Sequence, residues 1–457
     1  MTDLLERLDP PRSARLVAYD GAASIELDWP AVRAAAAERA RDVASLGSGR
    51  RVLGVSGVNG LETLLRIFSV LAAGGIPAPM PADTDAAVRA RCLAALGAAG
   101  LWADKDGWRA LDGNRQQPEG FELVMHSSGS TGIPKPLAIR LAAMRANAAM
   151  VAQALDLGPS DVHIGTFSHC YMSGLYNATI LPLATGARSV AVAQVTPLTV
   201  APFLRAMREH RPTVLWLSPL VARLFVTLKG VPADAFDGVR RAISCTAPLP
   251  PAVRQSFEAR FGLPLLQSYG LCETLITTVE DPARPGPGSV GRPVGPAGAV
   301  ALDEQGQIVI ANGCHFAGYL DQSASCAALA PVEPYATGDL GRFDGAGNLY
   351  VVGRLSETIN RDGIKFSPEA VEAVMNDLPG VRDSALVGID DPMVGTRLVA
   401  FVVAEAPDAE GIGRALAASL PTVQRPHEIR RVEALPRTAS GKIDRTLLKR
   451  EYAHGTH

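Results

Sequence analysis

Segments with strand-like and helix-like patterns alternate through the middle of the chain, and this alternation limits the folds that the sequence can adopt. Short apolar runs such as 162–166 and 214–217 are followed by longer segments with helical spacing, such as 251–261. Parallel strands need a crossover connection, which is usually a helix that packs on the sheet. The sequence therefore predicts an α/β fold with a large, mostly parallel sheet that is covered on both faces and carries ligand sites at the carboxyl ends of its strands.

The N-terminal part of the chain shows the same alternation. Asp28 and Pro30 are the N-terminal signals of a helix that is expected to run to about residue 46. A strand over 51–56, a helix over 61–73 and a strand over 76–80 should follow. This order of elements is typical of a βαβ unit.

Beyond Pro282 the chain changes to Gly- and Pro-rich turns with short strands, which indicates a small β-rich subdomain. From Arg354 onward the pattern is that of a compact α+β unit. We therefore expect a large N-terminal domain over residues 1–353 and a small C-terminal domain over residues 354–457.

Composition excludes several classes of function. The 457 residues have a formal net charge of −2 and no long block of like charges, so no nucleic-acid partner is expected. The six cysteines are scattered, which is typical of a reducing compartment. Neither a signal peptide nor an apolar run of membrane-spanning length is visible. These features favour a cytoplasmic protein with small-molecule ligands.

A glycine- and hydroxyl-rich stretch after residue 125 has the composition of a phosphate-binding loop. Its glycines allow close approach of a polyanion, while backbone N–H groups, hydroxyls and a lysine supply donors and positive charge. Pro134 and Pro136 flank the lysine and exclude a Walker A loop, which must open directly into a helix. A flexible surface loop is the alternative interpretation. The candidate phosphate ligands are Ser127, Ser128, Gly129, Ser130, Thr131, Gly132 and Lys135.

Three further stretches extend the pattern. They are Gln267-Ser268-Tyr269-Gly270-Leu271-Cys272-Glu273-Thr274, Tyr335-Ala336-Thr337-Gly338-Asp339 with Gly353-Arg354, and Leu435-Pro436-Arg437-Thr438-Ala439-Ser440-Gly441-Lys442-Ile443. With the phosphate loop they resemble the adenylate-forming superfamily, which contains acyl-CoA and aryl-CoA synthetases, adenylation domains of peptide synthetases, and luciferases. Taken alone, each charged residue in these stretches would be read as a solvated surface group, a turn cap or an ordinary ion pair.

The resemblance implies a role for each matching residue. Glu273 would bind Mg²⁺, which prefers hard oxygen ligands and bridges phosphates. Asp339 would hold the ribose hydroxyls, Arg354 would pair with ribose or the α-phosphate, and Lys442 would stabilise charge as the acid attacks the α-phosphate. Further nucleotide contacts are implied for Thr246, Ala247, Pro248, Ser268, Tyr269, Gly270 and Cys272.

The acyl pocket is expected beside Phe167-Ser168-His169, which resembles the family's aromatic gate. His169 is the candidate catalytic residue of this gate, although a lone histidine in an apolar segment is more often a core residue. The next position, where amino-acid-activating members carry an aspartate, is Cys170. A buried ammonium would have no partner there, so an α-amino acid is an unfavourable substrate. The expected pocket walls are His169, Cys170, Ser173, Gly174, Ser218 and Ser268, with Thr246 and Cys272 nearby.

Some positions depart from the family pattern. Ser356 stands at the hinge position, where the family has Asp or Lys, and Asn360 replaces a lysine. Gly363 keeps the smooth wall that the resemblance assigns to a pantetheine passage. Pro136 follows the phosphate loop where a glycine is usual. These departures leave the identity of the thiol acceptor open.

Together these features predict a two-step ligase with ATP, Mg²⁺ and CoA. A carboxylic acid, aromatic or of medium chain length, would react with ATP to give an acyl-adenylate and pyrophosphate, and CoA would then displace AMP. Rotation of the C-terminal domain about its hinge would serve both steps. A carrier protein with a phosphopantetheine thiol is the alternative acceptor of the acyl group. A nucleotide-binding protein without catalytic activity is the alternative function. A homodimer is among the expected assemblies.

Overall fold

The computed structural model describes residues 3–47, 49–104, 106–126, 134–320, 333–361, 364–391, 395–405, 409–437 and 443–453. The chain forms two compact units: Met1–Val300 with Ile310–Tyr335, and Ala301–Val309 with Ala336–His457. The predicted division into domains 1–353 and 354–457 stays a prediction.

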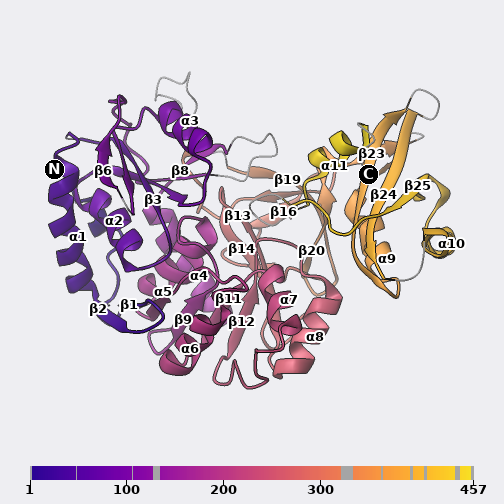
Figure 1. The fold of residues 1–457 in the computed structure, drawn as a ribbon, viewed down its shortest axis with the longest axis horizontal. Helices are drawn as coiled ribbons and strands as arrows, with labels where there is room; N and C mark the ends of the chain where they lie inside the picture. Colours follow the sequence, from indigo (N-terminus) through magenta and orange to yellow (C-terminus); the bar gives the residue numbers. More distant parts are fainter. Residues whose placement is uncertain are drawn as a thin grey trace. The chain divides into compact units, whose positions relative to one another are not determined.

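The larger unit is built on a sheet whose central strands are parallel (Figure 1). Its strands span Arg15–Tyr19 (β1), Ser24–Asp28 (β2), Val162–Gly165 (β9), Arg188–Ala191 (β10), Val214–Leu217 (β11), Arg241–Ser244 (β12), Leu265–Leu271 (β13), Leu275–Val279 (β14) and Arg292–Pro293 (β15). The strand order is β15-β14-β13-β12-β11-β9-β10-β1-β2. All pairs from β13 to β1 in this order are parallel, whereas β2, β14 and β15 pair antiparallel. The predicted large, mostly parallel sheet is confirmed.

Helices cover this sheet and the N-terminal part of the unit. They span Leu4–Arg7 (η1), Trp29–Ala44 (α1), Leu61–Ala72 (α2), Ala86–Leu96 (α3), Leu141–Leu155 (α4), Ser173–Ile180 (η2, a π-helix), Leu181–Ala184 (α5), Val200–His210 (α6), Pro219–Thr227 (α7) and Pro251–Phe261 (α8). The start of α1 follows from its sequence, since the Asp28 side chain accepts a hydrogen bond from Ala31 N and Pro30 lies in the first turn.

Both faces of the parallel strands are buried, as β11 shows. Val214 and Trp216 belong to the core that also contains residues of α4, η2 and α5. Leu215 and Leu217 belong to the core formed with α6, α7 and α8. Because successive side chains of a strand point to opposite faces, a strand between two helical layers must be apolar throughout. This explains the continuous run Val-Leu-Trp-Leu in the sequence.

Two smaller sheets complete the larger unit. Their strands span Val52–Gly57 (β3), Ile76–Pro81 (β4), Gly100–Ala103 (β5), Gly107–Ala110 (β6), Leu123–His126 (β7), Pro136–Ile139 (β8) and Gly318–Tyr319 (β18). The first sheet has the order β4-β3-β5-β6, with β3 parallel to both neighbours, which confirms the predicted βαβ unit. The second has the antiparallel order β18-β8-β7, and the predicted phosphate loop connects β7 to β8.

The smaller unit is an α+β arrangement of short sheets. Its strands span Val300–Leu302 (β16), Gln307–Ile310 (β17), Tyr335–Phe343 (β19), Leu349–Arg354 (β20), Ile359–Arg361 (β21), Ile364–Phe366 (β22), Val381–Asp391 (β23), Gly395–Ala404 (β24) and Glu428–Arg431 (β25). Its helices span Leu355–Glu357 (η4), Pro368–Asn376 (α9), Ala409–Ser419 (α10), Thr422–Gln424 (η5) and Arg445–Ala453 (α11). The sheets are ordered β16-β17-β19-β20, β21-β22 and β23-β24-β25. The predicted β-rich and α+β parts are both present.

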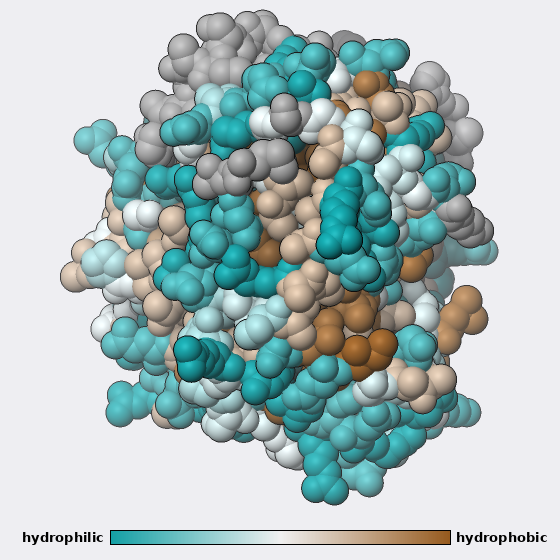
Figure 2. Space-filling view, turned by 90° about the vertical axis from the view of Figure 1, so that its left-hand side faces the viewer, coloured by the Kyte–Doolittle hydropathy of each residue, from teal (hydrophilic) through white to brown (hydrophobic). Residues whose placement is uncertain are grey.

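The face of the molecule in Figure 2 is largely hydrophilic. Ion pairs link helices α1 and α2 of the N-terminal part. Arg39 of α1 forms an ion pair with Glu62 of α2, and Arg66 of α2 forms ion pairs with Glu62 and with Asp42 of α1. Among the helices of the described residues, none has the length and apolar character that crossing a bilayer requires.

Candidate active site

The carboxyl ends of four neighbouring strands bring the predicted acyl-pocket and adenine-loop residues to one edge of the main sheet. The strands β9, β11, β12 and β13 are adjacent and parallel. The residues at or just beyond their carboxyl ends are Phe167, Ser168, His169 and Cys170 after β9, Ser218 after β11, Thr246, Ala247 and Pro248 after β12, and Ser268 where β13 passes beyond its parallel pairing. This is the edge at which open parallel sheets bind ligands.

Asn59, which follows β3, fixes the loop after β9. Its Oδ1 accepts a hydrogen bond from His169 N at 2.8 Å, and its Nδ2 donates to Phe167 O at 2.6 Å and to Val192 O at 3.2 Å. One side chain therefore ties together the segments that follow β9 and β10. The sequence analysis did not identify Asn59, because its partners lie more than a hundred residues away along the chain.

His169 is a buried and neutral imidazole. Its residue is 3% exposed, and its Nδ1 has no hydrogen-bond partner among the described residues. Burial lowers the pKa of His169 to about 4. The ring is therefore uncharged near neutral pH, and a buried nitrogen without a partner is available to a ligand.

Cys170 and Gly174 shape the same loop from inside. The Cys170 thiol lies 3.7 Å from Gly57 O, and burial raises the pKa of Cys170 to about 12, so the thiol is neutral. A Cβ atom at Gly174 would lie 2.0 Å from Ser168 O, which explains why glycine is needed there. The predicted pocket wall is thus an uncharged loop that closes tightly on the start of η2. Ser173, the first residue of η2, is partly buried.

The loop after β12 contains a strained backbone. Thr246 has a φ of +78°, in the region that a β-branched residue rarely adopts. Its side chain is exposed, and Pro248 beyond it is exposed as well. Strained residues of this kind are concentrated at ligand-binding sites. The predicted place of this loop beside adenine stays a prediction.

Ser218 has a structural task in addition to its predicted place in the pocket. Its side chain caps α7 by accepting a hydrogen bond from Val221 N at 3.3 Å. Since a serine hydroxyl also carries a proton, its donor remains for another partner.

The predicted metal ligand and the predicted phosphate lysine are joined by one tyrosine. Glu273 lies in the turn between β13 and β14, and it is 9% exposed. Tyr319 Oη donates a hydrogen bond to Glu273 Oε1 at 2.6 Å. Lys135 Nζ lies 5.8 Å from the centre of the Tyr319 ring, at cation–π distance. Tyr269, Gly270 and Cys272 lead into the turn that carries Glu273.

The smaller unit carries the predicted ribose ligand and its arginine as a pair. Asp339 and Arg354 are directly opposite each other on the antiparallel strands β19 and β20, and Arg354 Nε bonds Asp339 Oδ1 at 2.7 Å. Asp339 is 3% exposed, whereas 40% of the Arg354 side chain is exposed. The backbone N–H of Asp339 donates to Thr337 Oγ1. The two predicted residues therefore form an ion pair with each other.

The predicted hinge lies in a short helical turn just after Arg354. Ser356 is the middle residue of η4 and is exposed. Its neighbour Glu357 accepts a hydrogen bond from Arg445 Nη1 at 2.7 Å. Asn360 is exposed on β21, opposite Lys365 on β22.

Several predicted residues lie outside the part of the chain that the structure describes. They are Ser127, Ser128, Gly129, Ser130, Thr131 and Gly132 of the phosphate loop, Gly363, and the catalytic candidate Lys442. Their roles stay predictions.

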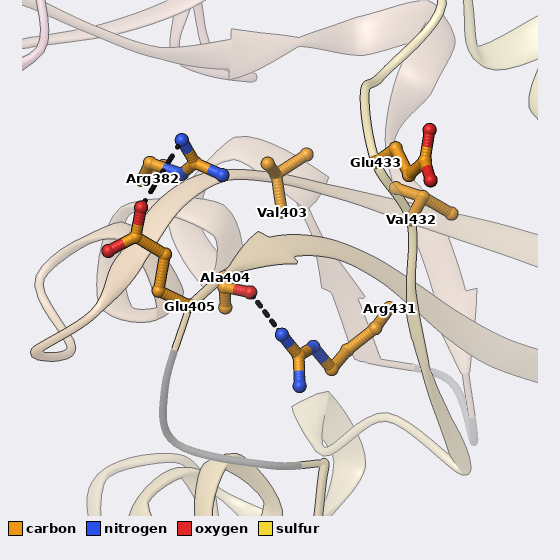
Figure 3. A pocket seen from close by; sticks show the side chains of 7 residues that line it. All are labelled: Arg382, Val403, Ala404, Glu405, Arg431, Val432 and Glu433. Atoms are coloured by element: carbon orange, nitrogen blue, oxygen red, sulfur yellow. Dashed lines mark hydrogen bonds and ion pairs between the residues drawn. The ribbon is translucent and has the colours of Figure 1, made fainter.

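A hollow in the smaller unit contains none of the predicted residues (Figure 3). Both of its arginines have partners in the protein, since Arg382 pairs with Glu405 at 3.5 Å and Arg431 donates to Ala404 O. It is lined by Arg382, Val403, Ala404, Glu405, Arg431, Val432 and Glu433.

Comparison with known proteins agrees with this geometry. Residues 102–320 match the family model of the AMP-binding enzyme, and residues 370–442 match that of the AMP-binding enzyme C-terminal domain. A sulfoacetate–CoA ligase of Cupriavidus necator is 32% identical over 348 residues, which are 73% of this chain and 67% of that protein. The chain belongs to the AMP-binding, adenylate-forming enzyme family.

Other members of this family are similar over a comparable length. A 3-hydroxybenzoate–CoA ligase of Aromatoleum sp. is 30% identical over 73% of this chain and 66% of its own length. The fold of MatB from Rhodopseudomonas palustris, solved with ATP bound, matches with a TM-score of 0.84 at 19% identity and covers 98% of both chains. The adenylate-forming fold expected from the sequence motifs is confirmed.

Buried neutral histidines recur in this enzyme. Burial lowers the pKa of His126 to about 4, of His163 to about 3 and of His169 to about 4. Trp216 Nε1 donates to His163 Nδ1 at 3.3 Å, and His163 Nε2 has no partner among the described residues. All three imidazoles therefore resist protonation in the folded state.

The free energy of unfolding should decrease on acidification because of these histidines. Between pH 6.5 and about 4 the unfolded chain binds more protons at these histidines than the folded chain does. Their contribution to the free energy of unfolding is therefore fully present above pH 6.5 and is lost as the pH falls towards 4. We expect the melting temperature of the wild-type enzyme to decrease more between pH 7.5 and 5 than that of the His163→Gln variant. The comparison separates the histidine from carboxyl groups that titrate in the same range. Equal decreases in both proteins would contradict this prediction.

Proposed function

We propose that this chain is an AMP-forming acid–thiol ligase that activates a carboxylic acid with ATP and transfers the acyl group to CoA. The observation that carries the proposal is one sheet edge that combines an uncharged loop around His169 with a turn that presents Glu273 and, through Tyr319, Lys135. An acid can lie on the uncharged side and a triphosphate on the charged side. The relatives named as sulfoacetate–, oxalate– and 3-hydroxybenzoate–CoA ligases support the same reaction class.

The first step would form the mixed anhydride. A carboxylate oxygen of the acid attacks the α-phosphorus of ATP, the bond from the α-phosphorus to the bridging oxygen breaks, and pyrophosphate leaves. Lys135 and the phosphate loop would hold the phosphates, Asp339 would hold the ribose, and Lys442 would stabilise the charge that develops at the α-phosphate.

A magnesium ion suits the donor set of the turn. Glu273 offers one hard carboxylate oxygen on a rigid turn, and Mg²⁺ is commonly bound by one or two carboxylates together with substrate phosphates. When bound, the ion would neutralise charge on the phosphate oxygens. The described residues contain no cluster of three or more metal-binding side chains, which agrees with a site that is completed by the nucleotide.

In the second step a thiol would attack the acyl carbon and AMP would leave. We propose CoA as the thiol, because the relatives named above are CoA ligases. Rotation of the C-terminal domain about Ser356 would bring the thiol to the acyl carbon after Lys442 has completed its step.

The acid is proposed to be uncharged apart from its reacting carboxylate. The loop Phe167-Ser168-His169-Cys170 and the neighbouring Ser218, Thr246 and Ser268 contain no lysine or arginine, and His169 is neutral. A second anionic group would be buried there without a partner, and an α-ammonium would meet the same obstacle. An aromatic or medium-chain acid satisfies this lining.

A screen of acids for pyrophosphate release tests the proposal directly. The purified enzyme is mixed with Mg·ATP and benzoate, hexanoate, oxalate, sulfoacetate or phenylalanine, and thioester formation is then compared for CoA and a pantetheinylated carrier protein. We expect release with benzoate- or hexanoate-type acids and acyl transfer to CoA. Transfer only to the carrier protein would favour the alternative acceptor, and ATP binding without release for any acid would favour a silent nucleotide-binding protein.

A further inference from the structure

Tyr319 is held rigidly beside the phosphate side of the site. The segment around it pairs with β8, with Gly318 opposite Ala138 and Tyr319 opposite Leu137. At one end of the segment Phe316 N donates to Glu273 O at 2.8 Å, and at the other end Leu320 N donates to Pro136 O at 3.0 Å. The backbone that carries Tyr319 is therefore bound both to the turn of Glu273 and to the residue after Lys135.

Aromatic contacts fix the ring of Tyr319 as well. Phe316 meets it edge-on with ring centres 5.0 Å apart, and Tyr335 Oη lies 3.2 Å from Tyr319 Oη. Edge-to-face packing of this kind stabilises a defined ring orientation. Tyr319 as a whole is nevertheless 43% exposed, so a ligand could reach it.

We propose that Tyr319 is a positioning residue that orients Glu273 through its hydroxyl and Lys135 through its ring for the binding of Mg·ATP. This inference rests on the proposed function. The hydroxyl engages Glu273 Oε1 at 2.6 Å, which leaves Oε2 for the cation. Carboxylates that bind metals are commonly oriented by such a second partner, and its loss costs about 10–100-fold in metal affinity.

Two substitutions separate the roles of the hydroxyl and the ring. Tyr319→Phe removes only the hydroxyl, with its bond to Glu273 and its contact with Tyr335, whereas Tyr319→Leu also removes the aromatic face beneath Lys135. We expect Tyr319→Phe to raise the Mg²⁺ concentration for half-maximal ATP binding by about 10–100-fold, with nucleotide binding in EDTA unchanged. Tyr319→Leu should in addition weaken nucleotide binding in EDTA by several-fold. Equilibrium titration of a fluorescent ATP analogue measures both the Mg²⁺ midpoint and the affinity in EDTA, without turnover.

The chain offers a closely matched control. Tyr452 Oη donates to Glu428 Oε2 at 2.8 Å, and the Arg430 guanidinium lies 4.5 Å from the centre of the Tyr452 ring. Tyr452→Phe therefore removes the same type of phenol–carboxylate bond from a tyrosine that also lies beside a cation, here the guanidinium of Arg430, in the smaller unit. Its Mg²⁺ midpoint should equal that of the wild type.

A double-mutant cycle with Glu273→Gln decides whether the hydroxyl acts through Glu273. The combined variant with Tyr319→Phe should be no weaker in Mg²⁺ dependence than Glu273→Gln alone. Additive losses, or a wild-type midpoint in Tyr319→Phe, would overturn the inference while leaving the proposed function intact. Absence of Mg²⁺-dependent ATP binding in the wild-type enzyme would instead overturn the proposed function.

Discussion

Replacing Lys442 by alanine is expected to lower adenylate formation by at least about 10²–10³-fold, the usual loss when a group that stabilises transition-state charge is removed. The lysine would meet the α-phosphate only as the acid attacks, so the affinity for ATP should change by no more than a few-fold. Pyrophosphate release with the best acid measures the rate of adenylate formation, and equilibrium binding of ATP measures the affinity.

The flanks of the Lys442 loop supply the structural setting of this prediction. Residues Arg437 and Ile443 form an isolated antiparallel bridge, Asp444 N donates to Pro436 O at 2.9 Å, and Arg437 forms an ion pair with Asp383 of β23. The two ends of the loop are therefore joined at its base.

Lys449 provides a control on the same unit. It lies exposed on α11, and Lys449→Ala removes one positive charge without touching the loop. This variant should release pyrophosphate at the wild-type rate. If the two substitutions had equal effects, net charge and not the predicted contact would explain the loss. In addition, Lys442→Ala should convert a supplied acyl-adenylate and CoA to thioester at close to the wild-type rate, because in the proposed mechanism the lysine acts only in the formation of the adenylate.

Local sequence signals determine the helices that were predicted well. The helix Pro251–Phe261 begins and ends at the predicted residues, because Pro251 occupies its first turn and Gly262, with a φ of +64°, ends it. By contrast, β1 was not predicted. It is a short strand that pairs with β2 in a local hairpin and with β10, more than 170 residues further along the chain, and the pairing with β10 leaves no local signal.

The same contrast holds for the site. Motifs whose residues are adjacent in the sequence, such as Gln267 to Thr274, led to the correct family and reaction class. Asn59 was missed, since it lies 110 positions before His169, and the bond between Tyr319 and Glu273 was not predicted, since 46 positions separate the two residues. The sequence pattern predicts a helix near 175–184, where the structure has the π-helix Ser173–Ile180 followed by α5, and the spacing of apolar residues does not distinguish these helix types.

Removal of the Arg445 side chain is expected to destabilise the smaller unit strongly. Arg445 bonds Glu357 at 2.7 Å, Glu369 at 3.1 Å and Glu372 at 2.7 Å, and only 17% of its side chain is exposed. Burial raises the pKa of Glu369 to about 7, and burial also raises the pKa of Glu372. The three carboxylates therefore depend on this one guanidinium for compensation of their charge.

Arg445→Ala should reduce the free energy of opening of this unit by about 3–5 kcal/mol, the usual cost of leaving buried charges without their partner. Hydrogen exchange of the paired amides of β23 and β24 measures that free energy locally. The control is Arg414→Ala, which removes an exposed arginine 3.6 Å from Glu410 on α10. Surface pairs of this type contribute about 0–1 kcal/mol. A loss as small as that of the control would contradict a compensating role for Arg445.

The pH dependence of the Arg445→Ala defect identifies its cause. Without the guanidinium, protonation neutralises the buried carboxyl groups, and their raised pKa values mean that the folded state then takes up protons that the unfolded state does not. The loss of stability should therefore be largest near pH 8 and should shrink as the pH falls towards 5. A defect that is equal at both values would indicate lost packing of the long side chain instead of uncompensated charge. Because Glu357 directly follows Ser356 and Arg445 lies three positions after Lys442, the same cluster connects the predicted hinge to the helix that follows the catalytic loop.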